Sequence, residues 1–175
     1  GTVASTSTLN NSSNTILNTS VGGAASSTTI VGIVNSSAWG TLNINSNIIR
    51  GTTSTATTGG FTGISNTGTV VTTINMNNNQ IGNASGNAIT FSAATSGAVL
   101  GISNTGGAST AALAMTGNDF RSIVHSVAGT SSHTYLNQAA ITLSQNISSN
   151  TFTNLNVNTT GSVTFISNSI TVPTS

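Results

Sequence analysis

The chain has 175 residues, and its only charged side chains are Arg50, Arg121 and Asp119, which give a formal net charge of +1. Two arginines without a lysine cannot form the basic surface that binds nucleic acid or an acidic membrane, and no apolar run is long enough for membrane insertion. The lack of cysteine excludes disulfides and thiolate metal sites. The length fits one domain, 1–175, which we expect to be a segment or protomer of a longer assembly.

Alternating apolar and polar residues predict short strands along the chain. The segment 41–47, TLNINSN, places Leu42 and Ile44 on one side of a strand. The segments 72–78, TTINMNN, and 111–117, AALAMTG, repeat this alternation. Gly, Asn, Ser and Thr recur every few residues as turn formers, and no window has helical periodicity. We therefore predict an all-β chain.

Two motifs recur with similar spacing, which indicates a repeat protein. The hexapeptide GISNTG occurs at 63–68 and 101–106, and its Ile-x-Asn core belongs to a row of related tripeptides. The first residues of these tripeptides are Ile33, Ile64, Ile102, Tyr135 and Ile166, at intervals of 31, 38, 33 and 31. Intervals of about 20 to 50 residues are typical of repeat architectures.

The second motif is an apolar residue, two spacers, Asn, one spacer and another apolar residue. Its asparagines are Asn47, Asn79, Asn118 and Asn150, with a weaker copy at Asn14. The intervals from Asn14 onward are 33, 32, 39 and 32, so both motifs lengthen in the third interval. We expect an insertion of about six residues there, between Gly82 and Ser96.

A unit of about 32 residues with short strands and turns fits one coil of a parallel β-helix, or β-solenoid, and about five coils fit the chain. Successive coils would stack about 4.8 Å apart. One inward apolar column should contain Ile33, Ile64, Ile102, Tyr135 and Ile166. A hydrogen-bonded ladder at a corner, where Asn tolerates left-handed backbone, should contain Asn47, Asn79, Asn118 and Asn150. We interpret both sets as structural.

Few residues are candidates for chemistry. Asp119 is the only acidic side chain, whereas glycoside hydrolysis generally needs two and a calcium-dependent lyase needs several, so we expect no catalytic residue and no enzyme. Asp119 and Arg121 flank Phe120 and should form a surface ion pair. His125 and His133 alone make an incomplete zinc site, and a loop or core position fits them better. We therefore expect no metal and no cofactor.

Trp39 is the one large amphipathic aromatic residue outside the predicted columns. It could contact a ligand such as a surface glycan, or it could fill a core or corner position. An ice-binding face is another reading of the lateral surface, and it needs Thr at the same position in successive coils. Thr67 and Thr105 meet this requirement, but Gln138 and Ser169 follow them in later coils.

The segment 42–68, LNINSNIIRGTTSTATTGGFTGISNTG, resembles the β-strand repeats of very large surface proteins secreted by gliding and related bacteria, which belong with right-handed parallel β-helix adhesins. The likeness extends over most of residues 9–170. It implies a right-handed parallel β-helix, secretion to the cell surface, and a role in adhesion or surface structure. The resemblance transfers no functional residues.

The function that we expect is that of a non-enzymatic, extracellular structural or adhesive β-helix. Motif copies reach both ends without a capping segment, so we expect part of a giant adhesin or a filament subunit that stacks end to end. The partners would be flanking repeats of the same chain or further copies of it, with surface glycans as another candidate. A carbohydrate-binding or carbohydrate-active β-helix is the main alternative, and an ice-binding β-helix is the lesser one.

Overall fold

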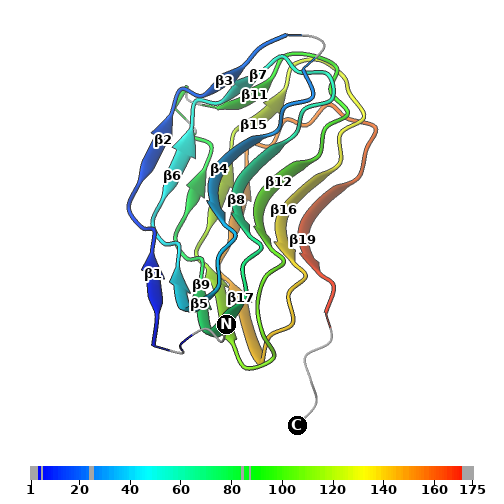
Figure 1. Cartoon of the computed structure of the whole chain (residues 1–175). Helices are drawn as coiled ribbons and strands as arrows, with labels where there is room; N and C mark the ends of the chain where they lie inside the picture. The colour runs from blue at the N-terminus through cyan, green and yellow to red at the C-terminus, as the bar shows by residue number, and fades with distance from the viewer. Residues whose placement is uncertain (1–3, 5, 24–25, 84, 87, 171–175) are drawn as a thin grey trace.

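A computed structural model describes residues 4, 6–23, 26–83, 85–86 and 88–170. The regular structure of these residues consists of short strands, and every pairing between named strands is parallel. The chain passes through four sheets in turn and repeats this circuit, so that five coils stack side by side along one axis (Figure 1). The predicted all-β fold, a parallel β-solenoid, is therefore confirmed.

We number the coils by the strands that they contribute. Coil 1 spans 8–35, coil 2 spans 39–66, coil 3 spans 70–104, coil 4 spans 112–138, and coil 5 spans 144–168. The colours of Figure 1 run across the stack from coil 1, in blue, to coil 5, in orange and red. Each coil pairs only with its neighbours, which is the defining property of a solenoid.

Sheets A and B form two adjoining walls of the solenoid. Sheet A contains β1 (Thr8–Asn10), β5 (Trp39–Asn43), β9 (Val70–Asn75), β13 (Ala112–Thr116) and β17 (Ser144–Ser148). Sheet B contains β2 (Thr15–Leu17), β6 (Ile48–Arg50), β10 (Gln80–Ile81), β14 (Asp119–Arg121) and β18 (Thr151–Thr153). Alternate side chains in both sheets, such as Leu42 and Ile49, point inward and are buried.

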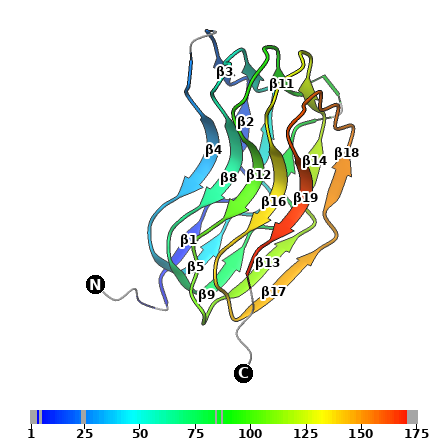
Figure 2. The same ribbon diagram turned by 90° about the vertical axis from the view of Figure 1, so that its right-hand side faces the viewer.

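Sheets C and D complete the circuit. Sheet C contains β3 (Ser20–Val21), β7 (Thr53–Ser54), β11 (Ile89–Phe91) and β15 (Ile123–His125). Sheet D contains β4 (Ile30–Asn35), β8 (Phe61–Asn66), β12 (Val99–Asn104), β16 (His133–Gln138) and β19 (Val163–Asn168). Figure 2 shows the strands of sheet D side by side in chain order. In coil 5, isolated bridges at Asn156 and Thr159 continue the pairing with coil 4.

Residues with left-handed backbone make two corners of the solenoid. The corner between sheets A and B uses Ser13, Ser46, Asn78, Gly117 and Ser149, with φ between 56° and 65°. The corner between sheets B and C uses Asn18, Gly51, Gly82, Ser122 and Asn154. The prediction that the ladder asparagines themselves are left-handed is wrong, because each one follows the left-handed residue of the first corner. The turn directs the amide of that next residue inward, where it is hydrogen-bonded.

The insertion expected in the third interval lies at the second corner. Residues 82–88 connect β10 to β11, whereas Ser122 alone makes the equivalent connection in coil 4. Because the extra residues leave the solenoid at a corner, they do not shift the register of coil 3. Ile81 still pairs with Ile49 in coil 2 and with Phe120 in coil 4.

The inward column of sheet D differs from the prediction in coil 4. Its members are Ile33, Ile64, Ile102, Leu136 and Ile166. The placement of Tyr135 in this column is therefore wrong. Gln138, and not Asn137, pairs with Asn104, so matching the motif on Asn137 moved the prediction by one residue. Tyr135 instead lies opposite Gly101 and is fully buried.

The position opposite Tyr135 holds glycine in the first coils. These glycines are Gly32, Gly63 and Gly101. A Cβ on Gly32 would lie 2.6 Å from the carbonyl oxygen of Gly63 in the next coil and 2.8 Å from Cδ1 of Ile49 in sheet B, so the position has no room for a side chain. In coils 4 and 5 the same position holds Tyr135 and Phe165, and the Tyr135 ring packs 6.1 Å from that of Phe120.

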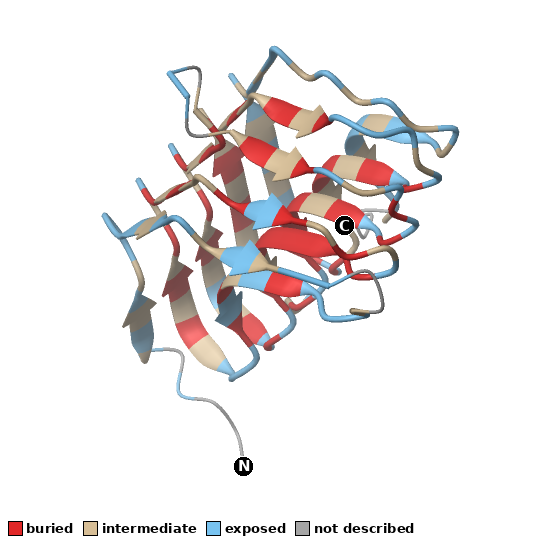
Figure 3. Ribbon diagram, turned by 90° about the horizontal axis from the view of Figure 1, so that it is seen from above, coloured by how far each residue is buried: buried red, intermediate tan, exposed pale blue. Residues whose placement is uncertain are grey.

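The core fills the interior along the stack. Buried apolar residues from all four sheets form one cluster, which runs from Ile30 in coil 1 to Leu136 in coil 4. Figure 3 shows this pattern as red segments that alternate with paler ones along the strands. The side chains of coil 5 are less buried, because coil 4 covers only one side of them.

Candidate functional site

The asparagine ladder lies just inside the corner between sheets A and B. Its members are Asn14, Asn47, Asn79, Asn118 and Asn150. In the first four members, the backbone N–H and the side-chain Nδ2 both donate to Oδ1 of the asparagine in the next coil, at 2.9 to 3.0 Å. Asn79 also donates its second Nδ2 hydrogen to the carbonyl oxygen of Ile44 at 2.8 Å. Its buried amide therefore uses its full capacity of two donors and two acceptors, which is a structural role.

A second amide ladder runs along the end of sheet D. Asn35 donates to Asn66 at 2.8 Å, Asn66 donates to Asn104 at 2.7 Å, and Asn104 donates to Oε1 of Gln138 at 2.7 Å. Gln138 then donates to the carbonyl oxygen of Ala140. Sequence reasoning missed Gln138, because Asn137, one residue earlier, has the residue type of the motif and the irregular spacing of the preceding copies does not distinguish the two positions.

His125 and His133 meet in the core, and a loop position is excluded. His125 ends β15 in sheet C, and His133 begins β16 in sheet D. Their Nε2 atoms lie 3.0 Å apart, so one imidazole donates a hydrogen bond to the other. The His125 ring stacks on Phe91 of coil 3 at a centroid distance of 4.6 Å. The hydroxyl of Tyr135 lies 3.4 Å from Nδ1 of His133.

Burial keeps the cluster of Phe91, His125, His133 and Tyr135 uncharged. Burial lowers the pKa of His125, and it lowers the pKa of His133 to about 4, with a further contribution from the charge of His125. Burial also raises the pKa of Tyr135 to about 12. Nδ1 of His125 is buried without a hydrogen-bond partner among the described residues. The described residues contain no group of three or more His, Cys, Asp or Glu placed to hold a metal ion.

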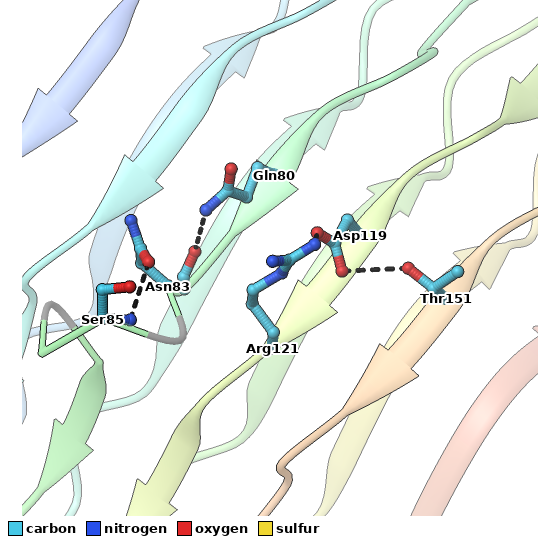
Figure 4. Close-up of polar contacts among 7 residues, drawn as sticks. Gln80, Asn83, Ser85, Asp119, Arg121 and Thr151 are labelled. Atoms are coloured by element: carbon cyan, nitrogen blue, oxygen red, sulfur yellow. Dashed lines mark hydrogen bonds and ion pairs between the residues drawn. The ribbon is translucent and has the colours of Figure 1, made fainter.

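All the charged side chains of the protein lie on the outer face of sheet B. Arg121 and Asp119, both on β14, form an ion pair (Figure 4). The hydroxyl of Thr151, on the neighbouring strand β18, donates to Oδ1 of Asp119 at a distance of 2.9 Å. Gln80 on β10 donates to the carbonyl oxygen of Gly82 at 2.8 Å. The expected surface ion pair is therefore present. Because Arg121 and Asp119 remain 36% and 17% exposed, solvent screens the pair.

Trp39 is held by the end of sheet D. It begins β5, pairs with Val70, and donates its indole N–H to Oδ1 of Asn35 at 3.1 Å. The ring is half-buried. Of the two roles considered from the sequence, a ligand contact and a core or corner position, the structure matches the corner position. The indole N–H already donates to Asn35.

The C-terminal end of the stack exposes positions that are buried one coil earlier. In coil 4 three of these positions hold His133, Tyr135 and Leu136, each 0% exposed. In coil 5 the same positions hold Val163, Phe165 and Ile166, which are 43%, 51% and 46% exposed. At the N-terminal end, Leu9 and Ile16 are only half-buried against the core. Both ends also present strand edges without a pairing partner among the described residues.

Parallel coils, internal amide ladders and a filled interior define the class of the protein as a β-solenoid repeat protein. The described surface contains no pocket. The described part of the chain also contains no helix long and apolar enough to cross a membrane. No protein-family model, curated protein or solved structure matches the chain.

Proposed function

We propose that this protein is a non-enzymatic structural or adhesive element of an extracellular β-solenoid, and that further β-coils cover its two open ends. Those coils come from flanking repeats of the same polypeptide or from a second copy of the chain. The observation that carries the proposal is the C-terminal end, where core positions of coil 5 are about half exposed. A contiguous apolar surface of this kind is typical of an interaction site.

Burial of this end favours contact with another coil. Fully burying a large apolar side chain contributes about 1.5 to 3 kcal/mol, so covering Val163, Phe165 and Ile166 from their half-exposed state contributes roughly 3 kcal/mol. The free edges of β17, β18 and β19 would also gain parallel hydrogen bonds. A formal net charge of +1 opposes association only weakly.

The available chemistry supports a structural role over an enzymatic one. Asp119 is the only acidic side chain, and it is engaged by Arg121 and Thr151. It therefore has no second carboxylate with which to share acid and base steps. The two histidines are sealed in the core and cannot meet a substrate. The extracellular location is supported by the likeness of 42–68 to secreted surface repeats.

The two alternatives for the lateral surface have less support. A glycan-binding face usually presents exposed aromatic rings, but Phe165 is the only exposed aromatic side chain of the described residues, and it lies at the end of the stack. An ice-binding face needs an unbroken column of threonines. The column of Thr8, Thr41 and Thr73 on sheet A continues with Ala112.

Electron microscopy of the native protein at moderate concentration, without added ligand, tests the proposal. We expect fibres or short stacks with a regular axial repeat, because the chain by itself carries the open ends whether they normally meet flanking coils or a second copy. Phe165→Lys should abolish the stacks by placing a charge in the end surface. Thr134→Lys, on the outer face of sheet D one coil earlier, is the matched control and should leave them intact.

Discrete monomers that persist at high concentration would contradict the proposal. Equal stacking by the two lysine variants would show that the contacts lie on the lateral faces. Circular dichroism of both variants checks that the solenoid is still folded, so that a loss of stacking can be assigned to the interface.

A further inference from the structure

The asparagine ladder has a direction. In each step the donors belong to the earlier coil and the acceptor belongs to the later one, as Asn47 N–H and Nδ2 donate to Oδ1 of Asn79. The same orientation holds from Asn14 to Asn47, from Asn79 to Asn118 and from Asn118 to Asn150. The two ends of the stack therefore differ in hydrogen-bonding character.

The unused groups at the two ends are complementary. At the N-terminal end, Oδ1 of Asn14 accepts no hydrogen bond from any described residue. At the C-terminal end, Asn150 donates one Nδ2 hydrogen to the carbonyl oxygen of Met115. Its second Nδ2 hydrogen and its backbone N–H have no acceptor in the described part of the chain. The C-terminal end thus offers the two donors that the free acceptor at the N-terminal end would receive.

The outer face of sheet A carries a shorter ladder with the opposite direction. Asn43 donates to Oδ1 of Asn10 at 2.7 Å, and Asn75 donates to Oδ1 of Asn43 at 2.8 Å. The side-chain nitrogen of Asn10 donates to no described residue at the N-terminal end. Ala114 interrupts the column in coil 4, and Asn146 follows it at the C-terminal end, where its Oδ1 accepts from the hydroxyl of Ser148 at 2.8 Å. Asn10 and Asn146 therefore occupy the same column at opposite ends of the stack.

We propose that the C-terminal end of one copy docks on the N-terminal end of a second copy, head to tail, in the register of the internal coils. Asn150 of one copy then donates to Oδ1 of Asn14 in the next, and the asparagine ladder continues across the junction. The inference rests on the proposed function, and it adds the polarity and the register of the contact. Contact between two like ends would instead face acceptor with acceptor, or donor with donor, in the asparagine ladder.

The same register places like side chains above one another in the other sheets. In sheet B, Phe152 would cover Ile16, which is half-buried in the isolated chain. In sheet D, Ile166 would lie on Ile33 and complete the apolar column. A single rigid placement therefore satisfies the ladder and covers the apolar end at the same time.

Cysteine cross-linking tests the polarity and the register, because the natural chain contains no cysteine. Asn10 and Asn146 are exposed, and in the proposed register they are neighbours across the junction. Neighbouring strands lie about 4.8 Å apart, which falls within the Cα separation of about 4.4 to 6.8 Å that a disulfide requires. The double variant Asn10→Cys/Asn146→Cys should therefore form a series of disulfide-linked multimers on oxidation.

The control variants define the outcomes. Asn10→Cys/Thr151→Cys places the second thiol at the same end but on sheet B, and it should remain monomeric on a non-reducing gel. Each single variant should also remain monomeric. Dimers of either single variant would show contact between like ends, and multimers of the sheet B control would show a rotated register. Either result overturns the inference.

The result for the double variant is read together with the microscopy. Stacks that give no cross-linked multimers would refute the proposed register and polarity and leave the structural function standing. The absence of both stacks and cross-links would refute the function and the inference together.

Discussion

The variant Asn79→Ala tests whether the buried asparagine ladder stabilises the stack of coils. Replacing Asn79 with alanine removes four hydrogen bonds, two accepted from Asn47 and two donated to Ile44 and Asn118. The backbone N–H of Asn47, one hydrogen of its amide and the carbonyl oxygen of Ile44 lose a partner, whereas Oδ1 of Asn118 keeps the N–H of residue 79.

Leaving a buried polar group unsatisfied costs about 1 to 3 kcal/mol, so three such groups predict a loss of at least about 3 kcal/mol. The matched control is Asn75→Ala. Asn75 donates a single bond on the half-exposed outer face, and the same column already contains Ala114 in coil 4, so we expect a loss below about 1 kcal/mol.

Urea unfolding followed by far-ultraviolet circular dichroism measures both variants against the natural protein, under conditions in which all three are monomeric. The midpoint should fall strongly for Asn79→Ala and only slightly for Asn75→Ala. Similar midpoints for the two variants would refute the view that the ladder stabilises the stack.

Three further predictions concern acidity, packing and charge. Because buried His133 has a pKa of about 4 and the unfolded residue titrates near 6.5, the unfolded state binds more protons between these values. The contribution of His133 to the free energy of unfolding should be fully present above about pH 6.5 and fall by roughly 3 kcal/mol toward pH 4. Urea unfolding at several pH values should show this dependence, and His133→Phe should lose most of it. An unchanged pH dependence in His133→Phe would contradict the role of His133. Gly101→Ala should lower the thermal midpoint and cost about 2 to 3 kcal/mol, because its Cβ would overlap the carbonyl oxygen of Tyr135 and the ring of Phe120. The control Gly22→Ala should be nearly neutral, because the nearest atom to its Cβ lies 3.9 Å away. Equal midpoints for the two variants would count against close packing of the sheets. Asp119→Ala should cost less than about 1 kcal/mol in urea unfolding at moderate salt, and a larger loss would mean that the surface pair is a structural anchor.

The regular part of the fold could be predicted because each repeated residue occupies a position that few other side chains can fill. Asn79 and its equivalents recur because a buried amide with two donors and two acceptors satisfies the neighbouring backbone, and few side chains can replace it. The period of the asparagines therefore gave the number of coils. The insertion at the second corner was also visible, because it lengthened both motifs together.

The parts that were missed have weaker sequence signals. The left-handed corner position accepts Ser46, Asn78 or Gly117, so no single residue type marks it. In coil 4, Gln138 replaces the asparagine of the second ladder, and the nearby Asn137 gave a false alignment that misplaced Tyr135.

The contact between His125 and His133 depends on the path of the chain between sheets C and D. The residues are eight apart in sequence, and their rings meet because β15 and β16 lie in successive walls of the same coil and direct both side chains into the interior. Residue spacing alone does not describe that path.

The change from glycine to aromatic residues along sheet D also bears on the proposed junction between copies. Coils 1 to 3 carry glycine where coils 4 and 5 carry Tyr135 and Phe165. Gly101 of coil 3 lies beside Tyr135 of coil 4, so a coil with glycine and a coil with an aromatic ring can be neighbours. In the head-to-tail register, Phe165 would lie beside Gly32 of the next copy. A stack of copies would therefore alternate between coils with glycine and coils with aromatic rings along its length.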